Sequence, residues 1–259
     1  MDNQTIRALE LISHNAWVAE EKMRLGGWLL RADHGVTRRA NSVLPLKSPG
    51  LPLSLAIDSA VEFYECRDIV PRFQMTEASQ PEELDAELAQ RGFSVGLQVD
   101  VWTADLSSLI GARSEFDTET LPELTDEWID TYSMASGHEP STMTTRLAIM
   151  KRTNQPHTYA KASIDGAIAS VGFGVVEGSW LGVFSVATLP DMRKRGAATA
   201  ISRELGTWAQ EFGANRAYLQ VEIGNTEAKN LYTKLGFKSA YRYWNRELIK
   251  EKESECRSC

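Results

Sequence analysis

The 259-residue sequence has few cysteines, no long hydrophobic run and no excess of positive charge. Three cysteines, Cys66, Cys256 and Cys259, are too few and too unevenly spaced for a disulfide scaffold or a zinc cluster, so we expect reduced thiols and no metal site. No stretch of 18 apolar residues occurs, which argues against a membrane-spanning helix. A net charge of −7 argues against a dedicated nucleic-acid-binding protein, because such proteins usually carry a basic face.

What remains is an ordinary globular composition. With 42% hydrophobic and 24% charged residues, the chain can bury a substantial core, and its length suits one large or two small domains. The first residues are polar and amphipathic and lack the basic and apolar regions of a signal peptide. Together with the reduced cysteines, this predicts a cytoplasmic protein.

Hydrophobic spacing predicts an α/β (α+β) chain. In the first 110 residues it indicates helices at 5–20, 54–66 and 81–91, and strands at 28–32, 36–46, 72–76 and 95–104. A polar connection follows at 105–120. The second half predicts helices at 124–136, 142–152, 197–212 and 226–235, and strands at 157–164, 167–176, 180–187, 216–223 and 241–248. Asp165-Gly166 is a strong two-residue hairpin signal between two of these strands.

The two halves also resemble one another. Residues 73–93 can be laid on residues 219–237 with a two-residue insertion, and both copies give a strand, a helix, Gly-Phe and another strand. Such self-similarity favours two related units, at residues 1–110 and 111–259. A chance match between short segments is the alternative.

The most informative stretch is the predicted strand–loop–helix junction at 183–205. Its loop holds Arg193-Lys194-Arg195-Gly196, and two small residues, Ala197 and Ala198, begin the helix. Glycine and alanine let a ligand approach the backbone, and a helix N-terminus has unpaired N–H groups and a positive dipole end. The loop therefore suits a pyrophosphate, although a solvated basic loop capping a core helix would have the same sequence.

At this point the sequence resembles a known family. The run Arg193-x-x-Gly196-x-Ala198 is similar to motif A of the GCN5-related N-acetyltransferases, and Asn225-x-x-Ala228-x-x-Leu231-Tyr232 resembles the signature that follows it. The resemblance covers residues 124–246. It implies two units, each a mixed, largely antiparallel, twisted sheet flanked by helices, with a splayed strand pair in the C-terminal unit.

The resemblance also implies a site for acetyl-CoA as cosubstrate. Val186 and Thr188 match the strand residues that pair with the pantetheine arm, and Asn225 matches an asparagine beside the cofactor. Residues Arg193, Lys194, Arg195, Gly196, Ala197 and Ala198 match the pyrophosphate loop. Tyr232 matches the tyrosine that protonates the departing thiolate. The N-terminal half has Leu88 at the register of Tyr232 and no cationic glycine loop, so only the C-terminal half is expected to bind acetyl-CoA.

The resemblance does not identify the general base or the acceptor site. Glu222, His138 and Glu139 are candidate bases, and water could instead take the proton. Arg39, with its polar neighbours on the predicted strand at 36–46, could line the acceptor pocket. For each of these residues an ordinary surface or capping role is the alternative.

These observations favour an N-acetyltransferase that moves an acetyl group from acetyl-CoA to a small-molecule or amino-acid-like amine by direct attack in a ternary complex. No cysteine lies in the motif region to act as a nucleophile. An acetyltransferase of protein N-termini or lysines, and a non-catalytic acyl-CoA-binding or regulatory module, are the alternatives. We expect no nucleic-acid or membrane partner, and either a monomer or a homodimer.

Overall fold

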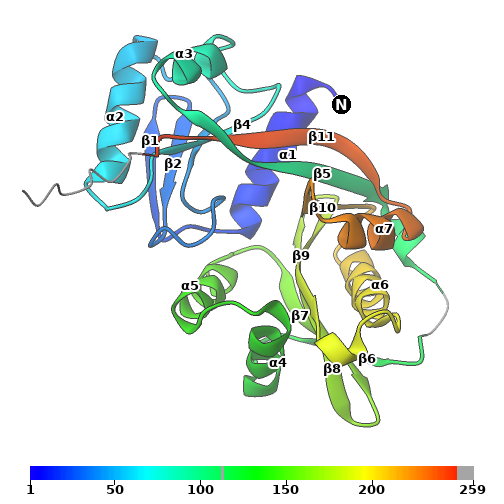
Figure 1. Cartoon of the computed structure of the whole chain (residues 1–259). Coiled ribbons are helices and arrows are strands. Elements are labelled where there is room, and N and C mark those ends of the chain that lie inside the picture. Colours follow the sequence, from blue (N-terminus) through cyan, green and yellow to red (C-terminus); the bar gives the residue numbers. More distant parts are fainter. Residues whose placement is uncertain (112–113, 250–259) are drawn as a thin grey trace, which may run out of the picture. The chain divides into compact units, whose positions relative to one another are not determined.

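The computed structural model describes residues 1–111 and 114–249 (Figure 1). Cys256 and Cys259, which were expected to be reduced thiols, lie outside the described residues, whereas Cys66 is exposed and free. Within the described part of the chain, no helix is long and apolar enough to cross a membrane.

Contacts divide the chain into two compact units whose limits differ from the expected division at residue 110. Unit 1 comprises residues 1–20 and 98–243, and unit 2 comprises residues 21–97 and 244–259. The first helix therefore groups with the C-terminal half, and two strands, β5 (Ser94–Asp105) and β11 (Lys238–Glu247), contribute residues to both units. That the N-terminal part is a degenerate copy of the second stays a prediction.

Unit 1 holds the larger part of the sheet and most of the helices. Its paired strands follow the order β11-β5-β10-β9-β8-β7-β6. β10 runs antiparallel to β5, and β7 and β8 run antiparallel to both of their neighbours, whereas β9 and β10 are parallel. Its other elements are α1 (Asn3–Ala16), η1 (Leu106–Leu109), β6 (Asp117–Leu121), α4 (Asp126–Ser136), α5 (Pro140–Lys151), β7 (His157–Ile164), β8 (Ala167–Glu177), β9 (Trp180–Thr188), η2 (Pro190–Met192), α6 (Ala197–Gln210), β10 (Arg216–Glu222) and α7 (Thr226–Lys234).

Alternating residues of β8 place α4 and α6 on opposite faces of this sheet. A Cβ atom at Gly172 would lie 2.4 Å from the side chain of Ile201 on α6, so the glycine lets that helix approach closely. Phe173 points the other way and contacts Tyr159, whose ring meets Trp128 on α4. The large, mostly antiparallel sheet flanked by helices confirms the expected fold class (Figure 1).

Unit 2 has a smaller arrangement of the same kind. Its strands follow the order β1-β2-β3-β4-β11. Its elements are β1 (Glu21–Leu25), β2 (Trp28–Ala32), β3 (Val43–Pro45), α2 (Leu53–Glu65), β4 (Arg72–Met75) and α3 (Leu84–Gln90). Apolar residues of β2 and β4, including Trp28 and Phe73, pack in one hydrophobic cluster with Ala56 and Tyr64 of α2 and Leu88 of α3.

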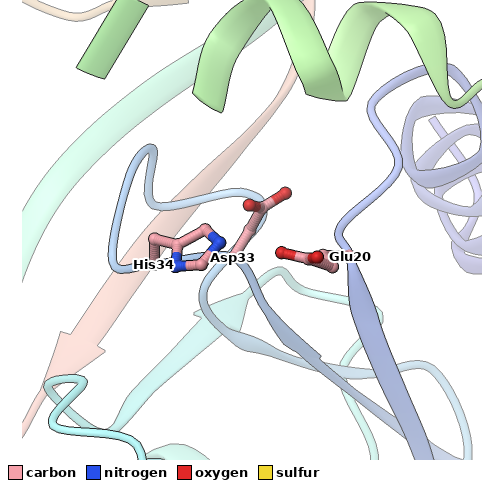
Figure 2. Close-up of side chains that lie close together, drawn as sticks. All are labelled: Glu20, Asp33 and His34. Carbon is pink, nitrogen blue, oxygen red and sulfur yellow. The ribbon is translucent and has the colours of Figure 1, made fainter. Parts of the chain in front are cut away.

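The strand predicted at 36–46 forms only in part. β2 forms its tight hairpin with β1, and only Val43–Pro45 of the expected strand at 36–46 is extended. The intervening loop, which carries Asp33 and His34 (Figure 2), is held by Asn41: its amide oxygen accepts from the Asp33 and Gly35 N–H groups at 2.7 and 3.0 Å. These side-chain bonds replace the strand pairing that the sequence pattern suggested.

The internal echo of the sequence corresponds to matching local structure. The order β4-α3-β5 in the first copy repeats as β10-α7-β11 in the second. The N–H of Phe93 bonds to the carbonyl of Leu88 at 3.0 Å, and the N–H of Phe237 bonds to that of Tyr232 at 3.0 Å. Leu88 and Tyr232 therefore occupy equivalent backbone positions, as the sequence alignment expected.

Candidate functional site

Strands β9 and β10 run parallel but pair over only three residues each. The paired positions are Arg216 to Tyr218 against Trp180 to Gly182. Both strands continue for several residues beyond the last pair, Tyr218 and Gly182, and there the pairing ends. The splayed strand pair that the resemblance implied is thus present within unit 1.

A β-bulge lies in β9 just beyond the point where the strands separate. Phe173 of β8 faces Phe184 and Val171 faces Ala187, so Gly172 alone faces both Ser185 and Val186. Ser185 takes a left-handed backbone conformation with φ of 51°, which is unusual for serine. A bulge leaves its extra residue outside the hydrogen-bonded ladder, so the pairing of β9 with β8 is interrupted at Ser185 and Val186, in the segment that has already separated from β10.

The cationic loop leads from the end of β9 into α6. Gly196 is the N-cap of that helix at φ of 96°, and a Cβ atom there would meet nothing within 4 Å. Arg193, Lys194 and Arg195 are exposed, and Arg193 Nε donates to the carbonyl of Thr188 at 3.4 Å. An N-cap glycine has no side chain that could accept hydrogen bonds from the N–H groups of the first helical turn. The loop therefore combines uncapped N–H groups with three cationic side chains.

Tyr232 lies on α7, in the hydrophobic cluster that also holds Val183 of β9 and Val221 of β10. It is 7% exposed, and its ring meets Phe237 edge to face at 5.5 Å. Burial raises the pKa of Tyr232 to about 12, which the nearby Ser202 hydroxyl partly counteracts. The phenol is therefore protonated at neutral pH and able to donate a proton.

Lys229 fixes α7, and with it Tyr232, to Asp100 of β5, and Arg242 of β11 pairs with the same carboxylate. Lys229 Nζ and Arg242 Nε lie 2.7 and 2.8 Å from the two carboxylate oxygens of Asp100 on β5. Burial acts to raise the pKa of Asp100, but the hydrogen bonds from Arg242 and Lys229 outweigh it and hold that pKa below its ordinary value.

Two other predicted cofactor residues make structural hydrogen bonds. Asn225 is the N-cap of α7, and its side-chain oxygen accepts from the N–H of Ala228 at 3.0 Å. Thr188 ends β9, and its hydroxyl lies 2.8 Å from that of Ser170. These bonds explain both residue types without a ligand, and the proposed cofactor contacts are additional to them.

The candidate bases are dispersed in unit 1. His138 and Glu139 connect α4 to α5; Glu139 caps α5 with its backbone, and its side chain is exposed. Burial, together with the charge of Arg146, lowers the pKa of His138. Glu222 is exposed at the end of β10, on the strand face that also carries Tyr218.

Arg39 lies in unit 2, in the loop between β2 and β3. The expected strand that would have presented it does not form there, because the side chain of Asn41 organises the loop. Its neighbour Arg38 donates to Glu247 at 2.7 Å, and Ser42 accepts from Arg31 at 2.8 Å. These neighbours are thus occupied in holding unit 2 together.

Sequence reasoning missed two residues beside the bulge. The hydroxyl of Tyr132 on α4 lies 3.3 Å from that of Ser185, on the opposite face of the sheet from α6. The ring of His138 lies 6.1 Å from that of Tyr132. No sequence signal marked Ser185. Serine rarely adopts a positive φ, so its presence in the sequence does not predict such a conformation.

A hollow of about 680 Å³ lies at the other ends of β9 and β10, and contains none of the predicted site residues. It is lined by Asp105, Leu106, Ser107, Ser179, Gln210, Ala214, Asn215 and Arg216. The candidate site is therefore defined by the strand separation and the loop rather than by this cavity.

Known proteins are similar to this chain in sequence and in fold. A family model described as "Probable histone acetyltransferase Rv0428c C-terminal" matches residues 3–245. The chain is 30% identical over 235 residues to the uncharacterized N-acetyltransferase YobR of Bacillus subtilis, covering 90% of this chain and 94% of that relative.

Two solved structures share the fold at low identity. A GCN5-related N-acetyltransferase from Kribbella flavida superposes with a TM-score of 0.69 at 13% identity, over 95% of this chain and 96% of that one. A tandem protein of the same family from the clavulanic acid biosynthesis pathway superposes with a TM-score of 0.59 at 13% identity, over 77% and 70%. On the family match, the relative and the fold together, this chain is an acetyltransferase that belongs to the GCN5-related N-acetyltransferase family.

Proposed function

We propose that this enzyme transfers the acetyl group of acetyl-CoA to the primary amine of a small-molecule or amino-acid-like acceptor, by direct attack in a ternary complex. The observation that carries the proposal is the separation of β9 from β10, together with the cationic loop that leads from the end of β9 into the open N-terminus of α6. Members of the family use acetyl-CoA. The cationic loop of this chain suits the pyrophosphate of that cofactor, and the separated strands suit its pantetheine arm.

The residues present fit that group. Gly196 leaves the backbone open, and Arg193, Lys194 and Arg195 supply positive charge at a helix N-terminus, which is an arrangement that binds phosphates. Ala197 and Ala198 begin the helix with small side chains. The separated segments of β9, with Val186 and Thr188, leave strand N–H and C=O groups that can pair with an extended pantetheine amide chain.

Each catalytic requirement has a candidate group. When bound, acetyl-CoA supplies an activated thioester. A backbone N–H at the bulge near Val186 would hold the carbonyl oxygen as negative charge develops on it, a contribution commonly worth about 3 kcal/mol. Tyr232 would give its proton to the departing sulfur, for which a phenol kept neutral by burial is suited.

The test is thiol release from acetyl-CoA in the presence of defined amines. The panel contains spermidine, L-lysine amide, glucosamine and a lysine-containing peptide, with mass spectrometry to detect the acetylated product. We expect release to depend on both the protein and one of the small amines. Preferential turnover of the peptide would assign the acceptor to proteins instead, and tight acetyl-CoA binding without any turnover would support a non-catalytic module.

A further inference from the structure

The C-terminal end of helix α1 is held within unit 1 by several polar contacts. Asn15 Nδ2 donates to Glu177 Oε1 of β8 at 2.9 Å, and the carbonyl of Asn15 accepts from the Thr153 hydroxyl at 2.9 Å. Arg152 Nη1 donates to the carbonyl of Val18 at 3.4 Å. The partners come from β8 and from the segment between α5 and β7, so this end of the helix has a fixed position in unit 1.

Trp17 lies at this fixed end of the helix. It is the C-cap residue of α1 and is 1% exposed. Its ring stacks on the ring of Phe184 in β9, with the ring centroids 6.1 Å apart and the ring planes 28° from parallel. The first helix of the chain therefore makes a direct aromatic contact with the strand that carries the candidate site.

Phe184 is also packed against aromatic rings of the two strands beside β9. Its ring centroid lies 6.2 Å from that of Phe173 on β8 and 5.8 Å from that of Tyr218 on β10, which it meets edge to face. Buried aromatic rings pack closely and prefer particular relative orientations. Rings from α1, β8 and β10 together therefore fix the direction in which the Phe184 side chain leaves β9.

Phe184 immediately precedes the β-bulge of β9. Ser185, the next residue, has φ of 51°, and the register with β8 resumes at Ala187. A positive φ at a residue other than glycine costs free energy and persists only where the surrounding contacts hold it. Ser185 has such contacts on both sides: its hydroxyl lies 3.3 Å from that of Tyr132, and the preceding side chain is packed against Trp17.

We propose that Trp17 is a positioning residue for acetyl transfer, which holds the bulge at Ser185 and Val186 in place by packing on Phe184. The inference rests on the proposed function, in which a backbone N–H near Val186 holds the carbonyl oxygen of the thioester. A donor that stabilises developing charge is effective when its position is fixed before the reaction. The first helix thus contributes to turnover although none of its side chains is proposed to touch a substrate.

The test compares Trp17→Leu with Leu9→Ala. Trp17→Leu keeps an apolar side chain and removes the ring that stacks on Phe184. Leu9 lies on the buried face of the same helix at 1% exposure, so its truncation destabilises α1 and leaves both rings in place. With saturating acetyl-CoA and the best amine of the panel, we expect Trp17→Leu to lower kcat by about 10- to 10²-fold, because small displacements of reacting groups have effects of that size. Leu9→Ala should leave kcat nearly unchanged.

Two further measurements separate positioning from a general loss of stability. The Kd of Trp17→Leu for acetyl-CoA, measured by calorimetry, should stay close to that of the wild type, since the interaction that is lost acts in the transition state. Trp17→Phe restores a ring against Phe184 and should recover most of the kcat. Normal kcat in folded Trp17→Leu, or an equal loss of kcat in Leu9→Ala, would overturn the proposal.

The bulge can also be observed without turnover. In protein labelled with ¹⁵N-valine, the amide resonance of Val186, assigned through Val186→Ile, should broaden or split in Trp17→Leu and stay sharp in Leu9→Ala. A sharp, unshifted resonance in both variants would contradict the hold of Trp17 on the bulge. If Trp17→Leu does not fold, Phe184→Leu removes the other ring of the pair, and full turnover in that variant would overturn the proposal.

Failure of the proposed function has a different result. Wild-type protein that neither binds acetyl-CoA nor acetylates any amine would overturn the proposed function, and the Val186 resonance would still show whether Trp17 holds the bulge. Wild-type turnover together with normal kcat in Trp17→Leu would overturn the positioning role alone.

Discussion

Gly182 is the last residue of β9 that pairs with β10, and its partner there is Tyr218. A Cβ atom at Gly182 would lie 2.7 Å from the hydroxyl of Tyr218 and 2.5 Å from the ring of Phe184. The absence of a side chain at position 182 is therefore what allows the Tyr218 ring to lie across β9. The same position is where the strands separate and where the proposed cofactor slot begins.

Replacing this glycine should disturb the packing at the strand separation. Gly182→Ala forces the Tyr218 and Phe184 rings apart, and we expect it to lower the free energy of unfolding by about 1–3 kcal/mol. Gly224→Ala is the matched control, because a Cβ atom at Gly224 would meet nothing within 4 Å, and it should change stability by less than about 0.5 kcal/mol. Urea unfolding of both variants measures the difference; equal stabilities would contradict the assigned packing.

Charge reversal in the loop should abolish cofactor affinity without unfolding the protein. Arg193→Glu and Arg195→Glu together replace two exposed cations by anions beside the N-terminus of α6. We expect the Kd for acetyl-CoA to rise at least about 10²-fold, since two attractive contacts become repulsive, and the melting temperature to change little. Calorimetric titration is the measurement. An unchanged Kd would refute the pyrophosphate assignment of this loop.

Removing the phenol hydroxyl at position 232 should affect turnover more than binding. Tyr232→Phe keeps the ring against Phe237 and removes only the proposed proton donor. We expect kcat to fall by about 10²-fold with little change in KM for acetyl-CoA, as for an interaction made only in the transition state. Steady-state kinetics from pH 6 to 10 test this. Full turnover across that range would show that the sulfur leaves without help from this tyrosine.

Stability at alkaline pH gives an independent check on the environment of Tyr232. Its pKa is raised from 10.0 to about 12 in the folded protein, chiefly by burial. Between these values the unfolded chain loses the phenol proton while the folded chain keeps it, so the free energy of unfolding falls as pH rises. Urea midpoints from pH 8 to 11 should decline above pH 10, and Tyr232→Phe should reduce that decline. Identical slopes would place the hydroxyl in contact with water.

The sequence predicted most of the C-terminal half because its signals are local, but the predicted connection at 105–120 holds η1 and most of β6. Asp165-Gly166 set the β7–β8 hairpin, and alternation and helical spacing gave β7 and α6 nearly to the residue. In unit 2 the same method failed at residues 36–42, which were predicted as part of a strand although polar groups fall on both of its faces, and where the side chain of Asn41 holds a loop.

The site was less predictable than the fold, because its parts meet through tertiary contacts. The loop at Arg193 to Gly196 carries its chemistry in consecutive residues and could be identified directly. Tyr132 and Ser185 are separated by 53 positions, and no periodicity links them. Likewise, the bulge at Ser185 depends on the register of β8 against β9, which the sequence of one strand does not encode.

Thermal unfolding with acetyl-CoA, and separately with ATP and NAD, tests the proposed cofactor most directly. All three ligands carry phosphates and adenosine, but only acetyl-CoA has the pantetheine arm that the separated strands are proposed to hold. At about 100 times its Kd, acetyl-CoA should stabilise the folded protein by about 2.7 kcal/mol and raise the melting temperature by several degrees, with little effect from the other two. A shift of equal size with ATP or NAD, or none with acetyl-CoA, would contradict the acetyl-CoA site.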